Sequence, residues 1–340
     1  MMKKVNWLGA QLGTCCVLAF MSANALATEA SAALIGKQEW LFYKYEFSEP
    51  SHDDLVKKSQ DLIKNFERVL AARGIRLTVA MVPLKIRIYS EFLPDELKLN
   101  SYVQGNYNQM LGVFSSAGVN AADLNSAFLS SPLRSGDTPL YFRLDSHWTP
   151  VGAMVGAEAL KKSFESDPKS LELLATVPTV KYTYKVANRK RPSRGRDLVD
   201  QLPPNSPTFA PELVAQVNVL REKPSQTDLL GTQDAPKIGM VGSSYSRDWT
   251  GFSDAIRYVL QRDVAVAAVG ADQGSWVGME AYLKDEAFQA SPPKLLIWEM
   301  PERDMKAPPD YKYREARYVM SNAEWLKRVT ELVQKAPAPR

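Results

Sequence analysis

Short apolar runs alternate with helix-like segments along this chain, and this alternation restricts its fold more than any other feature. Five runs have the length of a buried strand, at residues 75–82, 119–124, 237–242, 264–269 and 295–300. Apolar residues at helical spacing cover residues 54–72, 107–116, 151–164, 252–261, 277–288 and 313–335. Strands that alternate with helices predict an α/β fold, with helices on both faces of a parallel central sheet.

The length of 340 residues allows one large domain or two small ones. Residues 166–236 are rich in proline and polar residues and show no clear period. We therefore expect a single domain over residues 28–340 that carries this stretch as an irregular excursion. The formal net charge of +4 is too small to indicate a nucleic-acid partner.

The first residues have the pattern of a secretory signal peptide. Lys3 and Lys4 precede an apolar run over residues 5–21, and the small-x-small sequence at residues 25–27 follows it. The pattern predicts a signal peptide over residues 1–27 and a periplasmic protein. An uncleaved membrane anchor is the alternative, although polar residues interrupt the run and it is short for a full span.

Cysteine and histidine are scarce, which limits the chemistry that the mature chain can perform. Both cysteines, Cys15 and Cys16, lie in the predicted signal peptide, and the only histidines are His52 and His147. A disulfide, a thiolate metal site and a multi-histidine metal site are therefore excluded from the mature chain. We expect no metal and no cofactor, and any histidine chemistry has to use one of these two residues.

An Asp-x-His segment lies just before a predicted helix. Asp145 and His147 are two residues apart, so on an extended segment they point to the same side. Thr149 and Pro150 follow as a helix cap and a first helical residue. In this arrangement a carboxylate can orient an imidazole, although a surface pair of this kind is also common without any function.

A Gly-Ser segment follows the apolar run at residues 237–242. Gly242 and Ser244 would lie at the carboxyl edge of the parallel sheet, where α/β folds bind ligands. The glycine allows close backbone approach, and neighbouring amides could hold an oxyanion. A tight turn that needs only glycine and serine is an equally good interpretation of this segment alone.

The two segments are stronger together, because a serine hydroxyl needs a base to become a nucleophile. His52 lies in a polar turn beside a helix cap, which leaves His147 as the base and Asp145 as its partner. The sequence thus predicts a triad of Asp145, His147 and Ser244.

The same segments resemble a known family, the AlgX/AlgJ-type alginate O-acetyltransferases, which are SGNH-hydrolase-like proteins of the periplasm. Residues 142–153 resemble its DxHWTxxGA signature and residues 241–246 its VGTSYS block. Similar islands lie at residues 36–43, 82–94 and 297–303, in the family's order. We expect no carbohydrate-binding module after this domain, and the short AlgJ-like members are therefore the nearer comparison.

The resemblance implies a flavodoxin-like three-layer sandwich, with Ser244 as nucleophile, His147 as base and Asp145 as its orienting partner. Ser243 stands where the family often has threonine, and the spacing to the family block favours Ser244 over Ser243 as the reacting serine. The resemblance also implies an exopolysaccharide substrate, a membrane-bound O-acyltransferase as acetyl donor partner and a polysaccharide secretion complex.

Other residues are candidates for binding or support. We expect Gly242 and Tyr245 to support the oxyanion, and the candidates for substrate binding are Trp148, Lys85, Arg303 and Trp276. Trp249 also lies near the site in sequence. For each aromatic residue the alternative is core packing, and for each charged residue it is a structural ion pair. The basic residues within 185–196 form either a solvated loop or a guide for an acidic polymer.

These observations predict a periplasmic O-acetyltransferase that works through an acetyl-serine intermediate. Two alternatives use the same fold. If water takes the acetyl group, the protein is a polysaccharide acetylesterase, and if no acetyl group is bound, it is a polysaccharide-binding scaffold.

Overall fold

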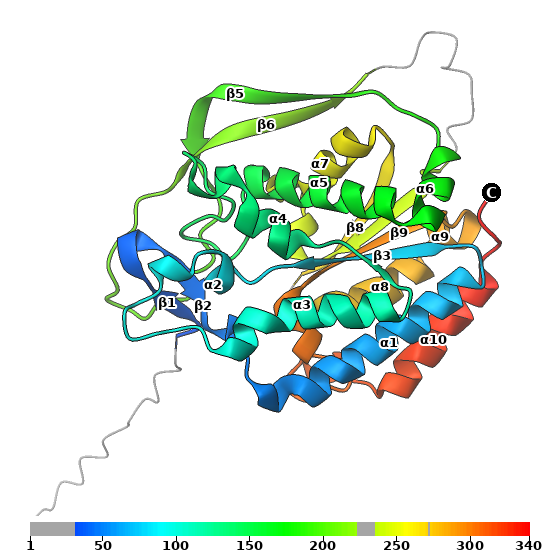
Figure 1. Ribbon diagram of the computed structural model, residues 1–340, viewed down its shortest axis with the longest axis horizontal. Coiled ribbons are helices and arrows are strands. Elements are labelled where there is room, and N and C mark those ends of the chain that lie inside the picture. Colours follow the sequence, from blue (N-terminus) through cyan, green and yellow to red (C-terminus); the bar gives the residue numbers. More distant parts are fainter. Residues whose placement is uncertain (1–30, 223–234, 271–272) are drawn as a thin grey trace, which may run out of the picture. The chain divides into compact units, whose positions relative to one another are not determined.

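Five parallel strands form the central sheet of the structure, a computed structural model that describes residues 31–222, 235–270 and 273–340 (Figure 1). In chain order the strands are β3 (Arg76–Val82), β4 (Asn120–Ala121), β7 (Ile238–Gly242), β8 (Val264–Ala268) and β9 (Leu295–Pro301). Their order across the sheet is β4-β3-β9-β7-β8, and every neighbouring pair is parallel. The predicted signal peptide, residues 1–27, lies outside the described residues.

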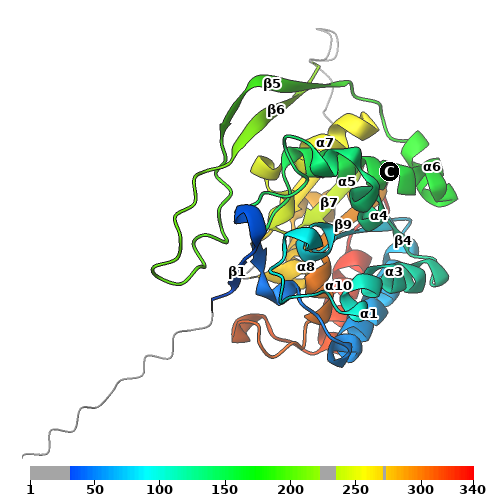
Figure 2. The same ribbon diagram turned by 60° about the vertical axis from the view of Figure 1, so that its left-hand side comes forward.

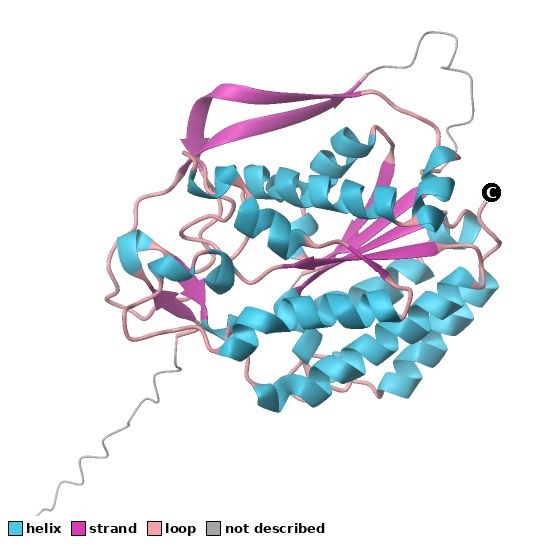
Figure 3. Cartoon of the chain, viewed as in Figure 1, coloured by secondary structure: helices cyan, strands magenta, loops and turns pink. Residues whose placement is uncertain are grey.

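Helices cover both faces of this sheet (Figures 1 and 3). One face carries α1 (Asp53–Ala71), α3 (Ser101–Ser116), α8 (Gly274–Lys284) and α10 (Asn322–Lys335). The other face carries α4 (Leu124–Ser130), α5 (Pro150–Ser166) and α7 (Phe252–Leu260). The predicted α/β three-layer sandwich with a parallel central sheet is confirmed.

Successive side chains of a strand point to opposite faces of the sheet, so each strand contributes to the core on both faces. In β3, Leu77 and Val79 pack with the core of α1, α3, α8 and α10, whereas Ala80 and Val82 pack with that of α4, α5 and α7. Every residue of β3 and β9 is buried. This explains why the runs are mostly apolar with no polar alternation, as expected for strands covered on both faces.

Several element boundaries differ from the predicted ones. The run at residues 119–124 forms only the two residues of β4, because Asp123 then caps α4 by accepting a hydrogen bond from the Ser126 amide. The last helix starts at Asn322, where the Ser321 side chain caps it, and not at residue 313. In both cases a local cap decides the boundary, and the apolar spacing alone does not reveal it.

The stretch at residues 166–236 is more regular than expected. It contains α6 (Pro168–Ala175) and an antiparallel ribbon of β5 (Tyr182–Pro192) and β6 (Leu213–Arg221). The expectation of an irregular excursion is therefore wrong for these segments. Most of β5 is exposed and its pairing shifts between Val186 and Lys190, so the strand has no alternating pattern that a sequence could reveal.

The ribbon packs near α7, and the loop between its strands returns toward a small hairpin of β1 (Ala33–Ile35) and β2 (Leu41–Tyr43) (Figures 1 and 2). A third apolar cluster fixes this loop, with Leu41 from the hairpin, Leu144 from the Asp-x-His segment, and Leu198 and Phe209 from the loop. The excursion is thus tied to the segment that carries Asp145 and His147. Within the described ranges, no helix is long and apolar enough to cross a membrane.

Substituting Gly152 tests how closely α5 approaches the segment before it. A Cβ atom at Gly152 would lie 2.1 Å from the Leu140 carbonyl oxygen, a backbone atom that cannot move aside. We expect Gly152→Ala to lower the free energy of unfolding by about 1–3 kcal/mol in urea denaturation.

Gly156→Ala, in the same buried helix, is the control. Its Cβ would meet no atom closer than 3.4 Å, so we expect a much smaller change. Equal losses in the two variants would contradict this account of α5.

Candidate active site

A continuous hydrogen-bonded chain joins the aspartate, histidine and serine that the sequence singled out. His147 Nε2 lies 2.7 Å from Ser244 Oγ, and His147 Nδ1 lies 2.7 Å from Asp145 Oδ1. The His147 backbone amide also donates to Asp145 Oδ1, at 2.9 Å. This order of groups can move a proton from the hydroxyl to the imidazole while the carboxylate holds the ring.

Local structure places these three residues at one edge of the sheet. Ser244 begins a short 3₁₀ turn, Ser244–Ser246, directly after the carboxyl end of β7. His147 lies just before α5, whose N-cap Thr149 accepts a hydrogen bond from the Gly152 amide. The chain passes from β3 outward to β4 on one side of β9 and from β7 outward to β8 on the other side, so the strand order reverses at the centre of the sheet. In α/β folds, ligands bind at the carboxyl ends of the strands beside such a reversal.

Burial and hydrogen bonding shift the pKa of Asp145 in opposite directions. Burial favours the neutral acid, but hydrogen bonds from the His147 ring and from the amides of Asp197 and His147 hold the pKa of Asp145 below its ordinary value. Asp145 is therefore ionised at neutral pH and can stabilise a positively charged His147 ring.

Asp197 is part of this arrangement, and the sequence analysis did not identify it. Its amide donates to Asp145 Oδ2 at 2.8 Å, and its carboxylate accepts from the Ser146 amide and hydroxyl at 2.7 and 2.6 Å. Burial and the nearby charge of Asp145 raise the pKa of Asp197. Asp197 lies in the loop between β5 and β6, so the excursion holds the Asp-x-His segment in place.

Glu299 is a second residue that the sequence analysis did not identify. It is fully buried in the central strand β9, and its carboxylate accepts from the Ser243 amide at 2.8 Å, the Ser243 hydroxyl at 2.9 Å and the Ser246 hydroxyl at 2.7 Å. These are the residues on either side of Ser244 and Tyr245. Glu299 therefore fixes the turn that presents Ser244.

Gly242 makes room for this carboxylate. A Cβ atom at Gly242 would lie 2.1 Å from Ser246 Oγ and 2.8 Å from Glu299 Oε2. The glycine is thus explained by close packing behind the serine turn. Its predicted part in oxyanion support remains a prediction.

Lys85 does not lie where a substrate could reach it, so its predicted role in substrate binding is corrected. It is fully buried, and its Nζ donates to the carbonyl oxygens of Leu41, Arg143 and Asp145 at 2.6, 3.0 and 2.9 Å. Burial lowers the pKa of Lys85 to about 8. The residue ties the Asp145 segment to β2, which is a structural role.

Trp148 and Trp276 are also corrected, because neither exposes its indole ring. Trp148 is 0% exposed and donates through Nε1 to the Tyr245 carbonyl oxygen. Trp276 packs against Trp298 and Trp325, with ring centroids 5.2 and 4.9 Å away, in the core of α1 and α10. The core-packing alternative holds for both.

Tyr245 and Arg303 brace the site from behind. The Tyr245 hydroxyl donates to the Ser146 carbonyl oxygen at 2.5 Å and accepts from Arg303 Nη1 at 3.2 Å. Burial raises the pKa of Tyr245, so the phenol stays protonated. Arg303 lies 3.6 Å from the buried Glu46, and its side chain is 13% exposed, which leaves its predicted contact with substrate untested.

Trp249 is the aromatic residue that stays exposed beside the histidine. It is 40% exposed, and its ring lies edge-on to His147 with the centroids 5.1 Å apart. His52, in contrast, lies in the turn before α1, where its Nδ1 accepts a hydrogen bond from the Glu49 amide. The structure thus keeps His52 out of the site.

Asp145, His147 and Asp197 are the one group in the described residues whose side-chain atoms lie close enough for metal binding, within 4.8 Å of each other. The side-chain atoms that face one another, Asp145 Oδ1 and Oδ2, His147 Nδ1 and Asp197 Oδ2, already take part in the hydrogen bonds given above. The arrangement therefore fits a charge-stabilised histidine better than a set of metal ligands.

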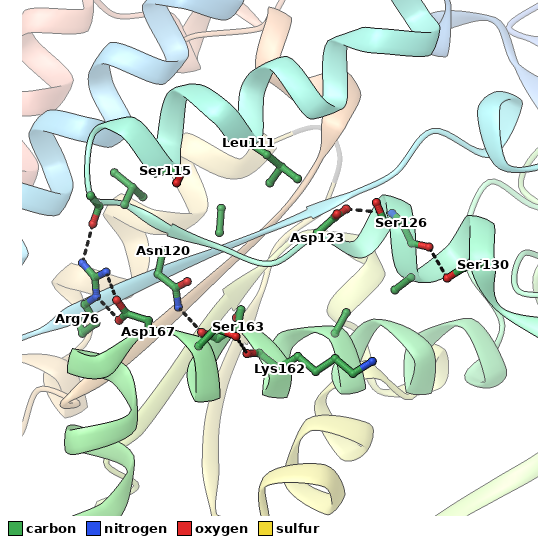
Figure 4. A pocket seen from close by; sticks show the side chains of 16 residues that line it. Arg76, Leu111, Ser115, Asn120, Asp123, Ser126, Ser130, Lys162, Ser163 and Asp167 are labelled. Atoms are coloured by element: carbon green, nitrogen blue, oxygen red, sulfur yellow. Dashed lines mark hydrogen bonds and ion pairs between the residues drawn. The ribbon is translucent and has the colours of Figure 1, made fainter.

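A separate pocket of about 610 Å³ lies at the β4 edge of the sheet (Figure 4). Two of its polar side chains already have partners: Arg76 pairs with Asp167, and Asn120 donates to Thr78 Oγ1. None of the three residues of the hydrogen-bonded chain lines it. This pocket is not the candidate active site.

The parallel sheet, the serine turn after β7 and the Asp-x-His segment beside it define the SGNH-hydrolase-like class. The family described as "SGNH hydrolase-like domain, acetyltransferase AlgX" matches residues 33–302, and the chain belongs to this family of O-acetyltransferases.

Named relatives agree with this assignment. The chain is 28% identical over 303 residues to "Probable alginate O-acetylase AlgJ" of Pseudomonas aeruginosa, covering 84% of this chain and 73% of the relative. The protein of the same name from Pseudomonas putida is 31% identical over 281 residues, covering 79% and 69%. The solved "O-Acetyltransferase Domain of Pseudomonas putida AlgJ" superposes with a TM-score of 0.71 at 26% identity, covering 89% of this chain and 99% of that one.

The pH dependence of the free energy of unfolding tests the role of the buried Glu299 carboxylate. Burial raises the pKa of Glu299 from its ordinary value of 4.5 to about 7. Between these two values the folded state binds a proton that the unfolded state has lost, so this residue makes stability fall as pH rises from about 4.5 to 7, with no further change above. Glu299→Gln removes this dependence.

Urea denaturation at a series of pH values from about 4 to about 9 measures this difference between wild type and variant. We expect the wild type to lose stability relative to Glu299→Gln over that window. The surface variant Glu286→Gln is the control, and two parallel curves for wild type and Glu299→Gln would contradict the assigned role.

Proposed function

We propose that this protein transfers acetyl groups to an exopolysaccharide in the periplasm through an acetyl-Ser244 intermediate. The observation that carries the proposal is the 2.7 Å contact between Ser244 Oγ and His147 Nε2, backed by the buried Asp145. Because the chain belongs to an acetyltransferase family, we expect the transferred group to be acetyl.

The first half of the reaction loads the enzyme. His147 Nε2 takes the proton of the Ser244 hydroxyl as Oγ attacks the acetyl carbonyl of a donor. The donor's leaving group then takes this proton from His147, and acetyl-Ser244 remains. Asp145 stabilises the imidazolium that exists between the two proton transfers.

Backbone amides are suited to hold the oxyanion in this step. Ser244 is the first residue of its 3₁₀ turn, and the first N–H groups of a helical turn have no partner within the turn. We assign the Ser244 amide as an oxyanion donor. Glu299 keeps this amide in place by fixing Ser243 and Ser246.

The second half transfers the acetyl group. A sugar hydroxyl gives its proton to His147 Nε2 and attacks the acetyl carbonyl carbon. The bond to Ser244 Oγ breaks, and Oγ recovers the proton from His147. Water in place of the sugar would give acetate, which is the acetylesterase outcome.

Substrate and setting follow from the relatives and from the N-terminal pattern. The matched relatives are named as probable alginate O-acetylases, which supports an exopolysaccharide as acceptor. The signal pattern at residues 1–27 supports export to the periplasm. Because the acetyl group originates in the cytoplasm, we assign the donor role to a membrane-bound O-acyltransferase within a secretion complex.

Serine substitutions test the proposal. With an acetyl ester as donor and an oligosaccharide as acceptor, mass spectrometry measures the acetylated sugar formed. We expect Ser244→Ala to form none, because no other hydroxyl of the described residues is hydrogen-bonded to His147 Nε2.

Ser243→Ala is the matched control. Its hydroxyl contacts Glu299 and not the histidine Nε2, so transfer should be slower but should persist. Full transfer by Ser244→Ala, or complete loss only in Ser243→Ala, would contradict the proposal. Acetate without acetylated sugar in the wild type would support the esterase instead.

A further inference from the structure

Asp197 approaches the same nitrogen of the histidine ring that Asp145 binds. Its Oδ2 lies 3.6 Å from His147 Nδ1, and Asp145 Oδ1 lies 2.7 Å from that nitrogen. The Ser146 hydroxyl lies beside both groups, 3.4 Å from His147 Nδ1 and 2.6 Å from Asp197 Oδ2, to which it donates. Two carboxylates therefore face the ring at the nitrogen opposite to the one that contacts Ser244.

The loop between β5 and β6 holds this second carboxylate by its backbone. A Cβ atom at Gly195 would lie only 3.2 Å from Asp145 Cγ, so the glycine lets the loop lie directly against that carboxylate. The Asp197 amide then donates to Asp145 Oδ2 at 2.8 Å. Leu198, the next residue, is fully buried in the third apolar cluster. Backbone and core contacts thus determine where the Asp197 carboxylate lies.

Other titratable groups face this cluster or the groups that surround it. They are Tyr43, Glu46, Lys85, Glu212, Tyr245 and Arg303. Lys85 donates to three carbonyl oxygens, and Arg303 lies 3.6 Å from Glu46, so both cations already have partners. The two phenols are neutral because burial raises the pKa of Tyr43 and of Tyr245. The ion pairs of the described residues give Asp197 one partner, the His147 ring.

The two carboxylates differ in how firmly they hold their charge. Hydrogen bonds keep the pKa of Asp145 below its ordinary value, whereas burial and the charge of Asp145 raise the pKa of Asp197. A positive charge on the His147 ring acts on both in the same direction and favours their ionised forms. The imidazolium that forms when Ser244 gives up its proton therefore offsets the repulsion between the two carboxylates.

We propose that Asp197 is a positioning residue of the acetyl transfer reaction, a second carboxylate that stabilises the protonated His147 ring together with Asp145. It acts in both halves of the reaction, because the ring takes a proton from Ser244 in the first and from the sugar hydroxyl in the second. This inference rests on the proposed function, and it makes the β5–β6 loop part of the machinery of that reaction.

Removing the charge of Asp197 while keeping its shape tests the proposal. Asp197→Asn leaves the backbone contact with Asp145 in place, and urea denaturation checks that the variant folds. With 4-nitrophenyl acetate as donor, we expect kcat/KM at its optimum to fall about tenfold. A negative charge beside the ring favours the protonated form, so the acid limb of the kcat/KM profile should move to lower pH by about one unit.

The Asp145→Asn background separates a counter-charge from a structural brace. If Asp197 only holds Asp145 in place, Asp197→Asn should cost nothing further once the Asp145 carboxylate is gone. We expect instead a further loss of about a hundredfold in kcat/KM, because Asp197 is then the remaining counter-charge. Asp197→Glu keeps the charge, so its acid limb should stay at the wild-type pH even where the longer side chain loosens the loop.

Asp200→Asn is the matched control, since it removes one exposed negative charge from the same loop. Ser146→Ala removes the hydroxyl that donates to Asp197 but leaves both charges, so we expect a smaller loss than in Asp197→Asn. The proposal is overturned if Asp200→Asn has the effect of Asp197→Asn, if the acid limb of Asp197→Asn stays at the wild-type pH, or if the double variant loses no more than Asp145→Asn. Failure of the proposed function looks different, since the wild type would then form no acetyl-Ser244 from the ester.

Discussion

The buried Glu299 carboxylate determines how this protein presents Ser244. It lies in β9, the middle strand of the sheet, and binds the residues on both sides of the Ser244–Tyr245 pair. A fully buried acid is costly unless donors surround it, and here three donors of the serine turn do so. The carboxylate therefore holds the turn in place, and the donors of the turn stabilise the buried carboxylate. Gly242 leaves the space for this contact.

The histidine side of the site depends on residues from distant parts of the chain. Lys85 binds the Asp145 carbonyl oxygen from behind, and Asp197 binds Ser146 and Asp145 from the ribbon loop. Both contacts act on the backbone or on the outer carboxylate oxygen, which leaves Asp145 Oδ1 free for the imidazole. The geometry of the candidate site thus depends on the whole carboxyl edge of the sheet rather than on three residues.

Much of this could be predicted from the sequence, where the information is local. Continuous apolar runs indicated the strands of the sheet, and Asp145, His147 and Ser244 could be found because each lies beside a recognisable element boundary. Glu299 has a weaker signal, a carboxylate inside a buried strand. Asp197 has none, because its contacts depend on how the ribbon folds back. Trp148 and Trp276 were misassigned because closeness in sequence does not say which face of an element a ring occupies.

The central claim is that acetyl groups pass through Ser244. Intact-mass and peptide-mapping measurements on the enzyme, first with an acetyl ester and then after an oligosaccharide is added, test it most directly. The account predicts an acetyl group on Ser244 that disappears as an equal amount of acetylated sugar forms. Acetylated sugar formed with no acetyl-enzyme, or an acetyl group on another residue that turns over at the rate of transfer, would contradict it.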